Sequence, residues 1–168
     1  MKEPDFKIHR LGRVNSEEFR SIRLEALKNF PEAFGSAYER EAAEPISFFS
    51  DRLERNAVFG AYRDGTLAGV AGFAAMNGPK NAHKGFLWGM YVRPAFQGSK
   101  AASLLMDRLI TYARARVELL QLTVVTTNSR ALRFYQRIGF SIYGIEQRAL
   151  KQGEQYFDEF LMVKFLKG

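Results

Sequence analysis

The sequence NSRALRFYQRIGF, residues 128–140, is the segment that says most about the fold of this chain. Its apolar side chains recur at the spacing of one helical face, at Ala131, Phe134, Tyr135 and Ile138. Asn128 stands where a side chain caps the free amides of a first helical turn. Gly139 stands where left-handed geometry commonly ends a helix. The segment therefore predicts a short helix packed on a core, with Tyr135 as a core aromatic and Asn128 as a cap.

The segments on either side alternate between strand and helix character. Strands are expected at Phe6–Val14, Ala57–Arg63, Thr66–Met76, Lys84–Val92, Leu119–Thr126, Phe140–Glu146 and Gln155–Phe165. Further helices are expected from Ser16 to Pro31 and at Ala33–Ala43, Pro45–Asn56 and Ser99–Arg116. Asp64-Gly65 is a hairpin signal between two strands. Because a strand-helix-strand unit implies a parallel pair, the order predicts an α/β (α+β) domain around a mixed sheet.

Length and composition set the broad class of the protein. With 168 residues, the chain has the length of a single domain, residues 1–168. It has no cysteine, and its two histidines, His9 and His83, are far apart in sequence, which argues against a metal enzyme. The start, Met1–Arg10, has no apolar core like that of a signal peptide, and no segment has the ~20 apolar residues of a membrane span. The expected location is the cytoplasm, with no membrane partner.

The net charge of +7 has more than one interpretation. Lys and Arg are spread along the whole chain, as on a solvated basic surface, but the charge would also attract an anionic cofactor or partner. A nucleic-acid-binding domain is the weakest interpretation, because no aromatic-rich RNA-binding strand motif accompanies the charge.

The junction between the strand Phe86–Val92 and the helix that begins near Ser99 is a candidate anion site. A loop that leads into a helix leaves backbone N–H groups unpaired, and the helix dipole favours negative charge there. Gly98 lets a ligand approach the backbone. The small residues that follow leave room for phosphate oxygens; they are Ser99, Ala101, Ala102 and Ser103. On spacing alone, a plain tight connection explains the same residues.

Two motifs resemble signatures of the GNAT superfamily of N-acetyltransferases. Residues 97–102 are similar to its acetyl-CoA loop, Arg/Gln-x-x-Gly-x-Gly/Ala, with Gln97 first and Ala102 last, although Lys100 stands where the family usually has glycine. Residues 128–140 match the second signature, Asn-x-x-Ala-x-x-Phe-Tyr-x-x-x-Gly-Phe, at every fixed position. The resemblance extends from about Phe6 to Phe165.

This resemblance implies a fold, a cosubstrate and a set of site residues. The fold is a mixed sheet of about seven strands with about four helices, in which the parallel strands 86–92 and 119–126 splay apart to hold acetyl-CoA. The residues implied to bind it are Met90, Tyr91, Val92, Gln97, Gly98, Ser99, Lys100, Ala101, Ala102, Ser103, Asn128 and Tyr135. Tyr135 is implied to be the general acid, and the Met90 N–H a candidate oxyanion donor. The implied activity is direct acetyl transfer to a primary amine, on a small molecule or a protein.

Several points stay open at this stage. The side chain of Lys100 would either crowd the diphosphate or contact it. A non-catalytic CoA-binding or sensor module on the same fold is the alternative function. Four carboxylates fall in the region expected to form the acceptor side, and each is expected to be solvated; they are Glu32, Glu39, Glu41 and Glu44. His83 is expected in a turn away from the sulfur. No base is assigned, and a homodimer through the final strands is not decided.

Overall fold

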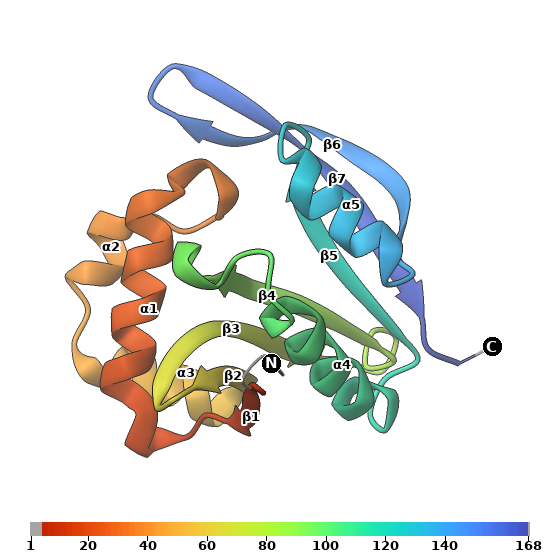
Figure 1. Ribbon diagram of the computed structural model, residues 1–168. Helices are drawn as coiled ribbons and strands as arrows, with labels where there is room; N and C mark the ends of the chain where they lie inside the picture. Colours follow the sequence, from red (N-terminus) through yellow and green to blue (C-terminus); the bar gives the residue numbers. More distant parts are fainter. Residues whose placement is uncertain (1–4, 168) are drawn as a thin grey trace.

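A computed structural model describes residues 5–167, which form one seven-stranded mixed sheet with helices on both faces (Figure 1). The strand order is β1-β2-β3-β4-β5-β7-β6, and β4–β5 is its parallel pair. Residues 1–4 and 168 of the expected domain lie outside the described residues. Residues 1–4 are also part of Met1–Arg10, the segment compared above with a signal peptide. Within the described residues, no helix is long and apolar enough to cross a membrane, and no three or more His, Cys, Asp or Glu side chains gather in a way that could hold a metal ion.

The elements follow the expected order. The strands are β1 Lys7–Arg10, β2 Ala57–Arg63, β3 Thr66–Ala75, β4 Lys84–Val92, β5 Leu119–Val125, β6 Ser141–Gln152 and β7 Gln155–Phe165. The α-helices are α1 Ser16–Asn29, α2 Tyr38–Ala42, α3 Ile46–Arg55, α4 Ala101–Arg114 and α5 Ser129–Arg137. Short 3-10 turns lie at Arg13–Asn15, Pro31–Ala33 and Pro94–Phe96.

Two cores lie on opposite faces of the β1–β4 half of the sheet. Helix α4 packs on one face, where Leu105, Met106 and Leu109 are fully buried. Helices α1 and α3 pack on the other, around Phe19 and Ile22. Helix α5 packs against the second half of the sheet, β5-β7-β6 (Figure 1). The two halves meet at the β4–β5 pair, and the site lies there.

Strands β4 and β5 are paired only at their beginnings and then diverge. Their register joins Lys84–Phe86 to Leu119–Gln121 and stops. On its other edge, β4 carries a bulge in which Gly89 and Met90 stand opposite the single residue Ala71 of β3. Gly89 has a φ of +64°, which glycine adopts without strain. Because a bulge bends its strand, β4 turns away from β5, which stays paired to β7 as far as Val125. The predicted splay of the parallel strands is confirmed.

Several element boundaries were predicted wrongly. The first strand ends at Arg10, because the 3-10 turn at Arg13–Asn15 follows, with the Asn15 side chain accepting from the Gly12 amide. The helix expected at Ala33–Ala43 is only the turn Pro31–Ala33 and the short α2, since residues 34–37 are irregular or extended. Helix α4 begins two residues late and ends two early, and β6 continues to Gln152 in a long hairpin with β7.

Candidate active site

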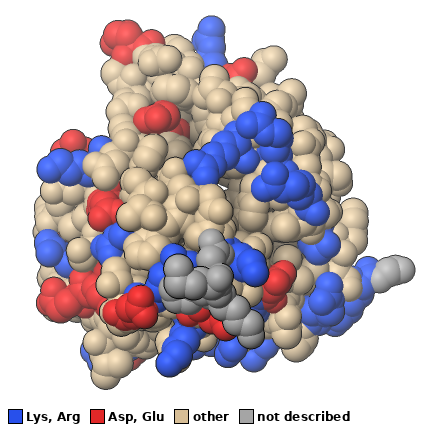
Figure 2. Space-filling view, in the orientation of Figure 1, with Lys and Arg blue, Asp and Glu red and all other residues tan. Residues whose placement is uncertain are grey.

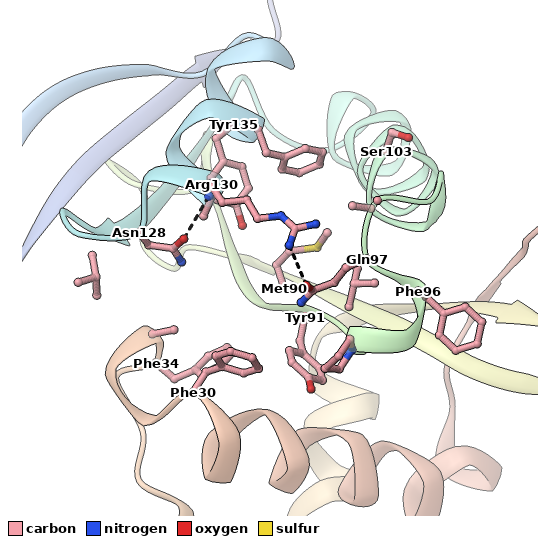
Figure 3. Close-up of a pocket in the computed structure, with 18 of the residues that line it drawn as sticks. Phe30, Phe34, Met90, Tyr91, Phe96, Gln97, Ser103, Asn128, Arg130 and Tyr135 are labelled. Atoms are coloured by element: carbon pink, nitrogen blue, oxygen red, sulfur yellow. Dashed lines mark hydrogen bonds between the residues drawn. The ribbon is translucent and has the colours of Figure 1, made fainter.

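A cavity of about 890 Å³ lies between the two halves of the sheet. The end of β4 and the start of α4 line one wall, the end of β5 and helix α5 line the opposite wall, and the loop after α1 closes the third side (Figure 3). The predicted site residues among its lining are Met90, Tyr91, Val92, Gln97, Gly98, Ser99, Ala102, Ser103, Asn128 and Tyr135. Lys100 and Ala101 are not: Lys100 is exposed to solvent, and Ala101, the first residue of α4, is buried.

The loop into α4 presents free backbone donors to this cavity. Gly98 has a φ of +78°, which turns the chain into the helix and is a conformation that favours glycine. The Ala101 amide is satisfied by the Ser99 hydroxyl. No hydrogen bond within residues 5–167 engages the amides of Gly98, Lys100, Ala102 and Ser103. Four unpaired donors at a helix N-terminus form a site suited to an anion such as a diphosphate.

The end of β4 is fixed by hydrogen bonds to α1 and β3. The Tyr91 hydroxyl donates to Glu25 at 2.8 Å, and Arg93 donates both to Glu25 at 3.2 Å and to the Leu67 carbonyl at 2.7 Å. Burial, together with the hydrogen bond to Glu25, raises the pKa of Tyr91 to about 12. These contacts fix the strand beside the bulge, where Met90 has no register partner in either β3 or β5.

Tyr135 is a buried aromatic whose hydroxyl reaches the cavity. Its ring makes edge contacts with Phe134 and Phe140, with centroids 5.4 and 5.9 Å apart. No residue in the described part of the chain hydrogen-bonds its hydroxyl group. Figure 3 shows the ring beside Met90, and both residues line the cavity. Burial raises the pKa of the hydroxyl well above its ordinary value, so it stays protonated at neutral pH. Tyr135 is therefore both a core aromatic, as its spacing predicts, and a residue that lines the cavity.

The start of α5 lies opposite the loop into α4. The Asn128 side-chain oxygen accepts from the Ala131 amide at 3.2 Å, so Asn128 is a helix cap, while its contact with a cofactor remains a prediction. Arg130 Nη1 donates to Gln97 Oε1 at 2.7 Å and joins the two walls (Figure 3). Sequence analysis did not single out Arg130, although it lies within the decisive motif.

One of the four carboxylates expected to be solvated is buried. Glu41 is 1% exposed and accepts from Arg23 Nε and Nη2 at 3.1 and 3.0 Å and from Arg52 Nη1 at 3.1 Å. Burial acts to raise its pKa, but Arg23, Ser36 and Arg52 outweigh it and the pKa is lowered. The expectation for Glu41 was wrong, because two distant arginines supply the partners that make burial tolerable.

A second cavity, of about 540 Å³, adjoins the first. It lies between the loop that joins α1 to α2 and the β6–β7 hairpin, and it shares Glu32 and Phe34 with the first cavity. Glu39 also lines it, whereas Glu44 lines neither cavity, and His83 lies in the turn before β4. Phe30 and Phe34, which sequence analysis missed, face the main cavity from this loop (Figure 3).

The splayed strands, the free amides and the enclosed tyrosine together form a cavity suited to an extended ligand that carries a diphosphate. Comparison with known proteins makes the class specific: residues 19–140 match the acetyltransferase (GNAT) family, so the chain belongs to that family. The sequence is 32% identical over 113 residues to the N-alpha-acetyltransferase RimI of Mycobacterium tuberculosis. That match covers 67% of this chain and 64% of the relative's length.

Solved structures share the fold. An acetyltransferase of the GNAT family from Streptococcus pneumoniae has a TM-score of 0.83 at 24% identity, covering 98% of this chain and 100% of that one. The protein yncA from Salmonella typhimurium, solved with its cofactor acetyl-CoA, has a TM-score of 0.82 at 17% identity, covering 98% of this chain and 95% of that one. The predicted fold class is confirmed.

Acetyl-CoA is the cosubstrate that this family implies, and the residues present fit it. The four free amides at the start of α4 supply donors for a diphosphate. The splay between β4 and β5 leaves strand edges free for an extended, amide-containing arm. The cavity volume lies within the range of cofactor pockets. Lys100 has a φ of −79°, which needs no glycine, and the residue is exposed to solvent.

Proposed function

We propose that this protein transfers the acetyl group of acetyl-CoA directly to a primary amine, with no covalent enzyme intermediate. The observation that carries this proposal is the meeting of three features in one cavity: the splay, the free amides and a protonated tyrosine. Acetyl-CoA, when bound, supplies a thioester whose carbonyl carbon accepts the amine. The free amides between Gly98 and Ser103 hold its diphosphate, and Met90 and Val92 pair with its arm as an added strand would.

The chain contributes two groups to the chemistry. The backbone N–H of Met90, a bulge residue with no register partner in either neighbouring strand, stabilises the negative charge that develops on the carbonyl oxygen. The Tyr135 hydroxyl gives its proton to the sulfur that leaves, because its raised pKa keeps the proton available throughout the neutral range. The amine must arrive neutral, and its proton leaves after attack; we assign no residue as base.

The acceptor amine enters through the second cavity. That cavity joins the first at Glu32 and Phe34, so an amine placed there reaches the splay from the side opposite the diphosphate. RimI of M. tuberculosis is, by its name, an N-alpha-acetyltransferase. Protein N-termini are therefore the first acceptors to test, followed by lysine peptides, polyamines and other small amines.

The test is acetyl-CoA-dependent thiol release across that panel of amines, with Tyr135→Phe as the key variant. The substitution removes only the hydroxyl, and the ring contacts with Phe134 and Phe140 remain. We expect kcat to fall on the order of 10²-fold or more, the typical share of a general acid, while the Kd for acetyl-CoA stays nearly constant.

Tyr112→Phe is the matched control. Tyr112 is a half-buried tyrosine of α4 that packs on Phe59 and Phe73 away from the cavity, so its loss should leave kcat unchanged. The proposal would be overturned if none of the amines in the panel caused thiol release, or if kcat were unchanged in Tyr135→Phe. Acetyl-CoA binding without transfer would instead support the CoA-binding module.

A further inference from the structure

The mouth of the main cavity is crossed by one side-chain contact, between Arg130 and Gln97. Arg130 lies in the first turn of α5 and Gln97 in the loop before α4, so the contact joins the two walls that the splay separates (Figure 3). Both side chains line the cavity and both are exposed to solvent. The distance from Arg130 Nη1 to Gln97 Oε1 is 2.7 Å.

Arg130 carries a full positive charge, but the group that it contacts, the side-chain amide of Gln97, is neutral. None of the ion pairs among residues 5–167 involves Arg130, Arg133 or Arg137, the three arginines of α5, and the helix contains no acidic residue. Figure 2 shows Lys and Arg side chains gathered where α5 lies. A guanidinium group binds a phosphate more strongly than an amide oxygen, because the hydrogen bonds are then charge-assisted and can be bidentate.

The geometry leaves most of this guanidinium available. Nη1 has one hydrogen bond, to Gln97, and the chain engages neither Nε nor Nη2 within the described residues. Gln97 is followed directly by the free amides of Gly98, Lys100, Ala102 and Ser103, which lie on the same wall. An anion bound to those amides therefore lies next to the residue to which Arg130 is already tethered.

We propose that Arg130 is a phosphate-binding residue that closes the cavity over the cofactor, and that Gln97 is a positioning residue that holds Arg130 across the mouth. The inference rests on the proposed binding of acetyl-CoA. Gln97 keeps its bond to Nη1, and the remaining donors of Arg130 face a phosphate group of the ligand. The bridge therefore orders a long, flexible side chain before the ligand arrives, which reduces the entropy lost on binding.

Two phosphate sources have the same chemistry: the diphosphate and the 3′-phosphate of CoA. Isothermal titration calorimetry with CoA and with 3′-dephospho-CoA separates them. We expect Arg130→Gln to weaken CoA binding roughly ten-fold, the effect of one hydrogen bond to a charged group at an exposed site. An equal loss with both ligands assigns the contact to the diphosphate. A loss with CoA alone assigns it to the 3′-phosphate.

Arg133→Gln is the matched control. It removes the same charge from the same helix, at an exposed position that does not line the cavity, so it should change the affinity little. Gln97→Ala should weaken binding several-fold in the wild-type background and have no effect on top of Arg130→Gln, because a positioning residue acts only through the group it positions.

Three outcomes would overturn the inference: unchanged affinity in Arg130→Gln for both ligands, an equal loss in Arg133→Gln, or additive effects of Gln97→Ala and Arg130→Gln. Failure of the wild-type protein to bind CoA would be a different result. That result would refute the proposed function itself, and the measurement on the wild-type protein alone would show it.

Discussion

Replacing Glu41 by glutamine should strongly destabilise the fold. The Glu41 side chain is buried, and its carboxylate pairs with two guanidinium groups, those of Arg23 and Arg52. The side chains of these arginines are 10% and 23% exposed. The substitution keeps the volume but leaves two neighbouring positive charges without their counter-charge. Removing one member of a buried ion pair typically costs about 3–5 kcal/mol. The partial exposure of Arg52 favours the lower end, about 3 kcal/mol, or a fall in Tm of about 6–12 °C for a chain of this length.

Urea unfolding followed by circular dichroism measures this loss, and Glu54→Gln is the control. Glu54 pairs with Arg13 at 2.7 Å, but the two side chains are 50% and 63% exposed, so solvent screens the pair and the change should be far smaller. A Glu41→Gln variant as stable as Glu54→Gln would refute the reasoning. It would mean that water reaches the two arginines and replaces the carboxylate.

The same contact gives a pH dependence with a defined sign. Glu41 has a lower pKa in the folded protein than in the unfolded chain, so the unfolded state binds more protons between the two values. The stabilisation is complete above the unfolded-state pKa of about 4.3 and is lost as the pH falls through the folded-state value. Glu41→Gln should therefore show a shallower loss of stability on acidification below about pH 5.

Two further predictions concern the reaction and the loop. The kcat/KM should rise with pH as the amine loses its proton, without a fall due to Tyr135 below about pH 10, because burial raises the pKa of its hydroxyl. A descending limb near pH 8–9 that disappears in Tyr135→Phe would contradict this. Lys100→Gly should weaken acetyl-CoA binding only a few-fold, and less at high salt, since its exposed charge is screened. Tighter binding in calorimetry would instead show that the lysine crowds the diphosphate.

Local patterns in the sequence were sufficient for most of the sheet and for α5. The helix at Ser129–Arg137 forms where the apolar spacing, the Asn128 cap and Gly139 place it, because each of these signals acts within one or two turns. The hairpin at Asp64-Gly65 forms for the same reason. The helix predicted at Ala33–Ala43 fails, because contacts with α1 and with β5, which is far away in sequence, shape that region.

The site was only partly predictable for a related reason. The family motifs lead to Gln97, Asn128 and Tyr135, which all line the cavity. They do not reveal which side chains meet across it. The Arg130–Gln97 bridge joins residues 33 apart, and the partners of Glu41 lie 18 and 11 residues away on other helices. A charge pattern along the chain cannot specify such pairs, because they depend on how the helices cross.

The bulge of β4 connects this buried cluster to the site. A Cβ atom on Gly72 would lie 2.4 Å from Trp88, so the indole lies close against β3 where the bulge begins. The guanidinium carbons of Arg23 and Arg52 lie 5.8 and 5.3 Å from the same indole ring. Arg23 Nη1 is also 3.5 Å from the position of a Cβ on Gly89. Loss of the Glu41 carboxylate would therefore leave the positive charges of Arg23 and Arg52 without a counter-charge next to the bulge that splays the strands. Glu41→Gln should for this reason lower kcat even at temperatures where the variant is fully folded.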